Sequence, residues 1–259
     1  MKHYNFDEVI NRKGTSCLKD AYQGKENLIP LWVADMDFAT PDFIIDALKK
    51  RCEHPIFGYT FDDDEYYASI LAWLNYKYNW KAEREWITYI PGIVKGIGLA
   101  VQCFTQPGDK VIIQPPVYHP FRLVPTRMGR EVVYNPLKLE DGVYKMDFEQ
   151  LESLIDKDCK MLILSNPHNP GGIVWEKEAL VKLAQICSAH GILVISDEIH
   201  AEMTYPQFRH HPFATVSPEA AACSVTFMAP SKTFNIAGIV SSYAIVPDAE
   251  LREKFYSFL

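Results

Sequence analysis

Short apolar runs that alternate with helical patterns, from about residue 85 onward, constrain the fold of this chain more than any other feature. Each run has four or five residues and is rich in β-branched or aromatic side chains, which is typical of strands. Several runs are apolar at every position, as strands covered by helices on both faces must be. The alternation predicts an α/β fold with a mostly parallel sheet. The runs are Trp86–Ile90, Lys110–Gln114, Met161–Leu164, Ile192–Ile195, Val225–Met228 and Ser242–Val246.

Helical patterns precede and separate these runs. We expect a helix from Pro41, because proline suits the first helical position and Thr40 can cap it. A second helix is expected over Asp64–Tyr78 and another over Lys177–His190, each with one apolar face. Residues 1 to about 40 show no clear periodicity. In the second helix the predicted apolar stripe consists of Tyr67, Ile70, Leu71 and Leu74.

The composition of the chain limits the kinds of molecule that it is expected to bind. The 259 residues carry a net charge of −7, which argues against a binder of nucleic acid or of an anionic membrane surface. No apolar stretch is long enough to span a membrane, and the N-terminus has no apolar signal core. Small molecules and other proteins remain as partners. The six cysteines form no CxxC pair, so we expect reduced thiols and a cytoplasmic protein. His210 and His211 adjoin without a third ligand in register, and we expect a solvated loop pair.

Polar residues directly after the predicted strands are the candidates for a site, since ligands of parallel sheets bind beyond the carboxyl ends of the strands. An Asn-Pro-rich loop with two glycines covers residues 165–172, and Asp197 follows the next run. Lys232 comes shortly after Val225–Met228. Gly92 precedes the start of a helix, where free backbone N–H groups can hold a phosphate. Each feature alone has an ordinary interpretation, as a turn, a cap or a solvated charge.

Together these residues make chemical sense around one cofactor. A lysine amine can form an imine with an aldehyde, and a carboxylate can keep a pyridine nitrogen protonated so that the ring accepts electrons. An asparagine and a histidine can hydrogen-bond a ring oxygen, and Tyr118 is the candidate to stack on the ring face. A helix N-terminus would bind the phosphate group. We therefore predict pyridoxal 5'-phosphate as the cofactor.

The order of these motifs resembles the fold-type I pyridoxal-phosphate enzymes, which are similar to aspartate aminotransferase. Within them the chain looks most like the cystathionine β-lyase, or carbon–sulfur lyase, branch, through Trp32–Phe38 and the Asp-Glu-Ile-His run that starts at Asp197. The resemblance covers essentially the whole chain. It implies a large domain with a seven-stranded, mostly parallel sheet and helices on both faces. The remaining motifs that carry it are Pro91–Val94, Tyr118, Asn169–Gly172 and Ser231–Asn235.

The resemblance also implies a role for each matching residue. Lys232 would form the imine and move the α-proton, and Asp197 would pair with the pyridine nitrogen. Tyr118 would stack on the ring, while Asn169 and His200 would bond its oxygen. The Trp32–Phe38 segment would line the substrate entrance. The phosphate would be held by the backbone of Ile93 and Val94, by Ser231, and by Tyr59 of a neighbouring subunit, so a homodimer is implied.

Three departures from the family pattern stand out. His200 takes the place of a tyrosine in many relatives, and Val240 stands where relatives have a phosphate-binding arginine. Relatives also continue well beyond the position of Leu259, so we expect an incomplete small domain without the arginine that clamps the substrate carboxylate. On this basis residues 1–50 are expected to form the N-terminal segment and part of the small domain, and residues 51–259 the large cofactor-binding domain.

The chemistry expected from these residues leaves alternatives open. Proton removal from an amino-acid substrate, followed by loss of a thiolate, would make the protein a carbon–sulfur β-lyase that acts on cystathionine or related S-substituted cysteines. Reprotonation of the same carbanion on the cofactor would make it an aminotransferase. Without a complete small domain the chain could also be a non-catalytic, cofactor-binding or regulatory remnant, or an unrelated α/β domain.

Overall fold

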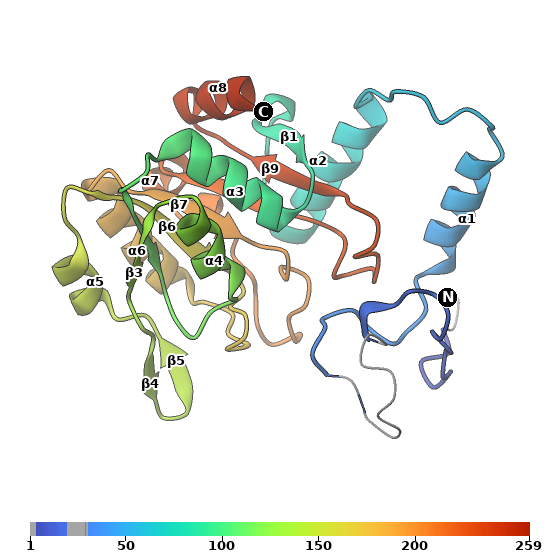
Figure 1. The fold of residues 1–259 in the computed structure, drawn as a ribbon, viewed down its shortest axis with the longest axis horizontal. Helices are drawn as coiled ribbons and strands as arrows, with labels where there is room; N and C mark the ends of the chain where they lie inside the picture. The colour runs from blue at the N-terminus through green and yellow to red at the C-terminus, as the bar shows by residue number, and fades with distance from the viewer. Residues whose placement is uncertain (1–3, 20–28, 30) are drawn as a thin grey trace. The chain divides into compact units, whose positions relative to one another are not determined.

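The computed structural model describes residues 4–19, 29 and 31–259, and two compact units are apparent in it. The smaller unit combines residues 1–60 with 230–240, and the larger combines residues 61–229 with 241–259. Figure 1 shows the chain from the N-terminus in blue to the C-terminus in red. The expected division after residue 50 stays a prediction, and the expected irregular stretch over residues 1–40 lies partly outside the described residues.

The larger unit is built on a seven-stranded sheet, counted over the described part of the chain. Only β9 runs against its neighbours, β1 and β8, while the remaining pairs in the sheet are parallel. This confirms the mostly parallel α/β fold. The strand order is β1 (Ile87–Ile90), β9 (Ser242–Ile245), β8 (Ser224–Met228), β7 (Leu193–Asp197), β6 (Cys159–Ser165), β2 (Lys110–Ile113) and β3 (Glu131–Tyr134).

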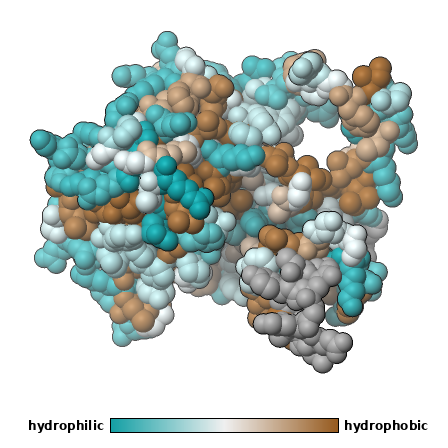
Figure 2. All heavy atoms as spheres, in the orientation of Figure 1, coloured by the Kyte–Doolittle hydropathy of each residue, from teal (hydrophilic) through white to brown (hydrophobic). Residues whose placement is uncertain are grey.

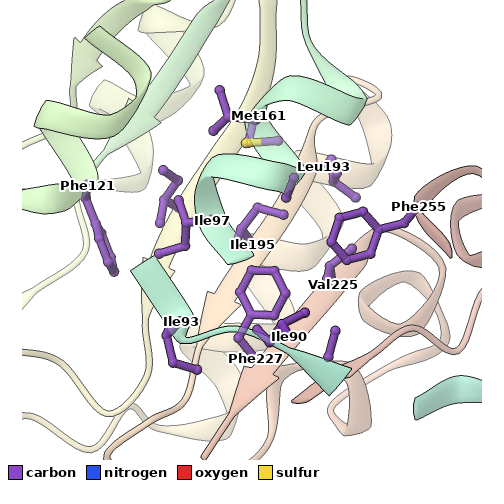
Figure 3. Close-up of a cluster of buried hydrophobic side chains, with 14 of the residues drawn as sticks. Ile90, Ile93, Ile97, Phe121, Met161, Leu193, Ile195, Val225, Phe227 and Phe255 are labelled. Atoms are coloured by element: carbon purple, nitrogen blue, oxygen red, sulfur yellow. The ribbon is translucent and has the colours of Figure 1, made fainter. Parts of the chain in front are cut away.

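One face of the sheet packs against α3 (Ile93–Phe104), α4 (Pro120–Arg127) and α8 (Ala249–Phe258). Figure 3 shows the resulting core, in which Ile97 of α3 lies among strand residues such as Ile195. Phe227 of β8 and Phe255 of α8 are both fully buried, with ring centroids 6.3 Å apart. Burial of these apolar side chains is the main force that fixes the helices on the sheet.

The opposite face packs against α5 (Phe148–Leu154), α6 (Lys177–Ala189) and α7 (Pro218–Ala222). Side chains that alternate with those of the first core, such as Leu162 and Val194, point to this face, so both faces of the central strands are dry. At the β1 end, α2 (Asp64–Tyr78) buries Ile70 and Leu74, which confirms the predicted helix and its apolar stripe. The short 3-10 helices η2 (Arg84–Trp86) and η3 (Phe213–Thr215) complete the described elements of this unit.

Strand β3, at the other edge of the sheet, and a separate two-stranded hairpin are elements that the apolar pattern does not reveal. Strand β3 is half-exposed, and the hairpin of β4 (Lys138–Glu140) and β5 (Val143–Lys145) is mostly exposed. Leu139 and Val143 of this hairpin leave more than half of their surface accessible, and Figure 2 shows apolar atoms over it. Exposed edge strands need no continuous apolar run, which is why the sequence pattern missed them.

The smaller unit contains α1 (Asp42–Cys52), none of whose residues is buried. Figure 2 shows hydrophobic atoms on the surface of this helix, where Phe43 and Leu48 are exposed. The prediction that Thr40 caps the helix is wrong. The helix begins at Asp42, one residue later than expected, so Pro41, which has no polar side chain, occupies the cap position. The Thr40 hydroxyl donates to the carbonyl oxygen of Asn235 at 3.0 Å.

Several general features complete the description. Within the described residues, no helix combines the length and the apolar character needed to cross a bilayer. The same residues contain no cluster of three or more histidine, cysteine or acidic side chains placed to bind a metal ion. All six cysteines are free thiols in the structure.

Candidate functional site

The carboxyl ends of β6 and β7 form the centre of the candidate site. Ser165, the last residue of β6, pairs in register with Asp197, the last residue of β7. The N–H group of Asn166 donates to the carbonyl oxygen of Asp197 at 3.0 Å, so the Asn-Pro loop begins beside the acid. The parallel register therefore places two of the predicted motifs at one edge of the sheet, as the sequence suggested.

Asp197 is a buried carboxylate at this edge, with 7% of its surface exposed. One of its oxygens, Oδ1, accepts a hydrogen bond from the N–H group of Ile199 at 3.1 Å. Burial, and then the negative charge of Asp197, raise the pKa of the Tyr118 phenol above its ordinary value. The acid and the tyrosine are thus close enough to interact electrostatically, although they are far apart in the sequence.

Tyr118 and Asn169 are joined through their backbones. The N–H group of Tyr118 donates to the carbonyl oxygen of Asn169 at 3.1 Å. The N–H group of Asn169 in turn donates to the hydroxyl of Ser165 at 2.9 Å. The Tyr118 ring packs edge-on against Phe121 of α4, yet about a third of the residue (36%) remains exposed. The structure therefore brings Tyr118, Asn169 and Asp197 together, with surface left on the tyrosine for a ligand.

The start of α3 provides a place for an anion. Gly92 precedes the helix with a φ of +100°, a conformation that glycine adopts without strain. No side chain caps the helix, and its first turn contains no acidic residue. The first intrahelical bond runs from the N–H of Gly96 to the carbonyl of Gly92. The N–H groups of Ile93 and Val94 come before this first bond, so neither has a carbonyl partner within the helix. Such N–H groups can bind a phosphate.

His200 lies on the turn after β7 and is half-buried. Its Nδ1 atom is 3.5 Å from the sulfur of Met203. Both His200 and Asn169 contribute to the wall of a pocket of about 930 Å³ in the larger unit. Most of the other lining residues are apolar or aromatic, including Tyr144 and Trp175. The pocket thus adjoins two of the residues that the sequence assigned to the cofactor.

A buried polar cluster behind Asp197 was not found from the sequence. Glu198 is 1% exposed and accepts hydrogen bonds from the Ser196 hydroxyl and the Phe213 N–H, each at 2.8 Å. Its other oxygen lies 2.8 Å from Nε2 of His210. The prediction of a solvated pair is therefore wrong for His210, which is 4% exposed. The sequence did contain a signal for this cluster, namely a second acid directly after Asp197. An acid that is buried needs a hydrogen-bond donor close to it.

The remaining predicted site residues belong to the smaller unit and are described there by themselves. Ser231 is buried, and its carbonyl oxygen accepts a hydrogen bond from the N–H of Ile236 at 2.9 Å. Lys232 is half-buried and follows the last residue of β8, Met228, by four positions. Tyr59 is fully exposed, and Val240, at the position of the missing arginine, is exposed as well. The assignment of Ser231, Lys232 and Tyr59 to one site with Asp197 stays a prediction.

The Trp32–Phe38 segment of the smaller unit is held by two cations. Arg12 donates to a carboxylate oxygen of Asp35 at 2.5 Å, and Lys19 lies 3.0 Å from a carboxylate oxygen of Asp37. Lys19 is 8% exposed although it is charged, so its pairing with Asp37 satisfies a buried ammonium group. The two acids of this motif therefore have structural partners within the unit.

Comparison with known proteins places the chain in a family. The model for class I and II aminotransferases matches residues 26–258, and the chain belongs to that family. It is 45% identical to cystathionine beta-lyase PatB of Bacillus subtilis (strain 168), over 98% of this chain and 67% of the relative. It is 31% identical to the protein MalY of Escherichia coli (strain K12), over 99% of this chain and 66% of the relative.

The similar proteins also include an aminotransferase and a solved structure with a bound cofactor. Aspartate aminotransferase of Sulfolobus acidocaldarius is 28% identical over 87% of this chain and 57% of that protein. The crystal structure of cystalysin from Treponema denticola, which contains a pyridoxal 5'-phosphate cofactor, matches 99% of this chain and 67% of its own with a TM-score of 0.94 and 36% identity. These findings confirm the resemblance stated from the sequence. The chain spans about two thirds of the length of the Bacillus and Escherichia relatives.

Proposed function

We propose that the protein is a pyridoxal-phosphate-dependent carbon–sulfur β-lyase. Its substrates would be cystathionine or related S-substituted cysteines, and its products a thiol, pyruvate and ammonia. The relatives named cystathionine beta-lyase and the cofactor in the cystalysin structure support this proposal. The chain spans about two thirds of the length of these relatives and contains the sheet and the lysine loop on which the proposed chemistry depends.

The buried Asp197 at the end of β7 is the observation that carries the proposal. Its carboxylate lies at the edge where the Asn169 loop and Tyr118 also gather, while the N-terminus of α3 offers N–H groups without an acid beside them. A ring nitrogen, a ring oxygen, a ring face and a phosphate are the four features of the cofactor that such residues can bind. The donor and acceptor set therefore fits pyridoxal phosphate.

When bound, the cofactor supplies an electron sink for the pair of electrons left when a proton leaves Cα of an amino acid. Asp197 would keep the ring nitrogen protonated, and Asn169 and His200 would hydrogen-bond the ring oxygen. Tyr118 would hold the ring in place by stacking. The N–H groups of Ile93 and Val94, with the hydroxyl of Ser231, would hold the phosphate.

Lys232 would act as the base in this scheme. Its Nζ atom would take the proton from Cα, after which the thiolate leaves Cβ and a carbon–carbon double bond forms. The thiolate would take up a proton to give the thiol, and water would convert the remaining enamine to pyruvate and ammonia. No oxidant or reductant is needed, because the bond electrons leave with sulfur.

Two finer proposals concern the setting of the protein. We propose a homodimer in which Tyr59 contributes to the phosphate site of the partner subunit, since its side chain is fully exposed and has a phenol that can donate a hydrogen bond. We also propose a cytoplasmic location, because six free thiols persist in a reducing compartment.

An aminotransferase is the second candidate, favoured by the match to the aminotransferase family and to the Sulfolobus enzyme. The two activities differ in their need for an acceptor. A lyase releases pyruvate and thiol from cystathionine without any keto acid, whereas an aminotransferase turns over only when a keto acid is supplied.

The deciding experiment is a turnover assay on the purified protein with pyridoxal phosphate and L-cystathionine. We expect pyruvate and thiol in equal amounts without a keto acid, and a visible absorbance band that borohydride removes. Lys232→Ala should lack this band and lower kcat by at least about 10³-fold, and Asp197→Asn should keep the cofactor but lower kcat by about 10²-fold or more. Cofactor binding without turnover, both with and without a keto acid, would instead identify a non-catalytic protein.

A further inference from the structure

Asn235, three residues after Lys232, makes an unusual set of hydrogen bonds with the Trp32–Phe38 segment. Its Oδ1 atom accepts from the N–H of Met36 at 3.0 Å. Its Nδ2 atom donates to the carbonyl oxygens of Met36 at 3.1 Å and of Phe38 at 2.8 Å. One side chain therefore engages three backbone groups that lie about 200 positions away in the sequence, all within the smaller unit.

The backbone of Asn235 adds to this connection. Its carbonyl oxygen accepts a hydrogen bond from the Thr40 hydroxyl at 3.0 Å. Its φ of +55° lies in the left-handed region, which asparagine tolerates better than most residues. The preceding residue, Phe234, packs edge-on against Phe43 of α1, with ring centroids 6.3 Å apart. Position 235 thus requires both a particular backbone conformation and an amide side chain.

Lys232 belongs to the same short turn as Asn235. The N–H of Phe234 donates to the carbonyl of Pro230 at 3.0 Å, and the N–H of Ile236 donates to that of Ser231 at 2.9 Å. Both bonds span Lys232, and the second also spans Asn235, so the two residues share one hydrogen-bonded turn. Its connection to residues 36–40 is made by Asn235, and the segment itself is held by Arg12 and Lys19 through Asp35 and Asp37.

We propose that Asn235 is a positioning residue, which fixes the turn of Lys232 against residues 36–40 and thereby sets where the lysine amine is held for proton transfer. We call the hydrogen bonds between Asn235 and residues 36–40 the clamp, and these bonds are a property of the fold. Only the role of the lysine amine in proton transfer rests on the proposed function. Displacement of a reacting group by about 1 Å can lower a rate by about 10²-fold, so the loss of this clamp should be visible in catalysis.

The amide is the one side chain that fits this position. It offers an acceptor and two donors at the tip of a short side chain, and the Met36 N–H and the two carbonyls use all three. Aspartate would keep the acceptor but would place a negative charge against two carbonyl oxygens. Glycine would keep the left-handed backbone and lose every side-chain bond. Both substitutions therefore remove side-chain hydrogen bonds of Asn235, and glycine does so while it keeps the left-handed backbone conformation.

The first test measures amide hydrogen exchange in the protein saturated with pyridoxal phosphate. Asn235→Gly should raise exchange at Met36 and throughout residues 231–236 together. Asn79→Gly is the matched control, because Asn79 also has a left-handed φ, of +54°, but caps α2 in the larger unit. It should leave exchange in both segments unchanged. Unaltered protection at Met36 in Asn235→Gly would overturn the proposal without any reference to activity.

The second test measures turnover and the isotope effect of an α-deuterated substrate. Asn235→Gly should lower kcat by about 10- to 100-fold and raise the isotope effect on kcat, because proton transfer becomes slower than the other steps. A purely structural defect would lower the active fraction and leave the isotope effect as in the wild type. Asn79→Gly should match the wild type in both quantities.

The outcomes separate this inference from the proposed function. Raised exchange at Met36 and residues 231–236 in Asn235→Gly, together with no lyase activity in the wild type, contradicts the proposed function and supports the hydrogen-bonded connection made by Asn235. Lyase activity with an unchanged isotope effect and kcat in Asn235→Gly contradicts the positioning role. If Asn235→Gly does not fold, Asn235→Asp replaces it, with the same expected rise in exchange and isotope effect.

Discussion

The two compact units hold their proposed site residues by different means. In the larger unit, Asp197 and the Asn169 loop are set by the register of β6 and β7, whose side chains form two dry cores. In the smaller unit, the Lys232 turn is set by hydrogen bonds from one asparagine, beside a helix with no buried residue. Substitutions should therefore act through packing in the first region and through specific polar contacts in the second.

This contrast has a physical basis in cooperativity. Each central strand of the sheet is paired with a neighbour on both sides and covered by helices on both faces, so a local change there must work against many apolar contacts. Among its described residues the smaller unit buries no apolar side chain, so its arrangement depends more on individual polar contacts. Four pairs of substitutions break or sharpen this comparison, from the largest expected effect to the smallest.

Truncation of an aromatic core residue should produce the largest difference between the units. Phe227→Ala removes a fully buried ring from β8 and should lower the free energy of unfolding by about 3–5 kcal/mol. Phe43→Ala, on a residue of α1 that is 57% exposed, should lower it by less than about 1 kcal/mol. Urea denaturation measures both values. Equal losses would show that the smaller unit is packed as tightly as the sheet.

Addition of a single methyl group should also distinguish the units. A Cβ atom on Gly96 of α3 would lie 2.6 Å from Cδ1 of Ile90, so Gly96→Ala should cost about 1–3 kcal/mol unless Ile90 changes rotamer. A Cβ atom on Gly238 would meet nothing within 4 Å, and Gly238→Ala should change stability by less than about 0.5 kcal/mol. Thermal unfolding compares them. A neutral Gly96→Ala would mean that α3 is free to shift on the strands.

Acid should weaken the larger unit through His168. Burial lowers the pKa of this histidine to about 4, from 6.5. Between these values the unfolded chain binds a proton that the folded chain does not, so stability falls as the pH falls, by up to about 1.4 kcal/mol per pH unit. His168→Gln should flatten this dependence when unfolding is followed from pH 7 to pH 4. His54→Gln, at an exposed residue of the smaller unit, is the matching substitution there.

Ion pairs should have the smallest effect. The side chains of Arg12 and Asp35 are 30% and 16% exposed, so Arg12→Gln should cost up to about 1 kcal/mol, and less at high salt. The Lys145–Glu140 pair of the hairpin is 58% and 50% exposed, and Lys145→Gln should change stability very little. Denaturation in 0.05 M and 1 M salt measures both. A loss for Arg12→Gln that is independent of salt would contradict an electrostatic origin.

The elements that the sequence predicted share one property, which is that their buried residues recur at a regular spacing. The central strands and the helix over Asp64–Tyr78 have continuous or periodic apolar residues, and the structure confirms them. Strands β3, β4 and β5 were missed because edge strands are half-exposed and need no such pattern. The cap assigned to Thr40 was wrong because the helix begins at Asp42 and its cap position falls on Pro41.

The sequence by itself determined the α/β fold and the residue types that suit a pyridine cofactor, because apolar periodicity and strand-end chemistry are local properties. Only the tertiary structure decided that His210 is buried against Glu198 and that Asn235 engages Met36 and Phe38. Such contacts join residues that no periodic pattern relates. They depend on the register of strands and on the path of loops, which many side chains set together.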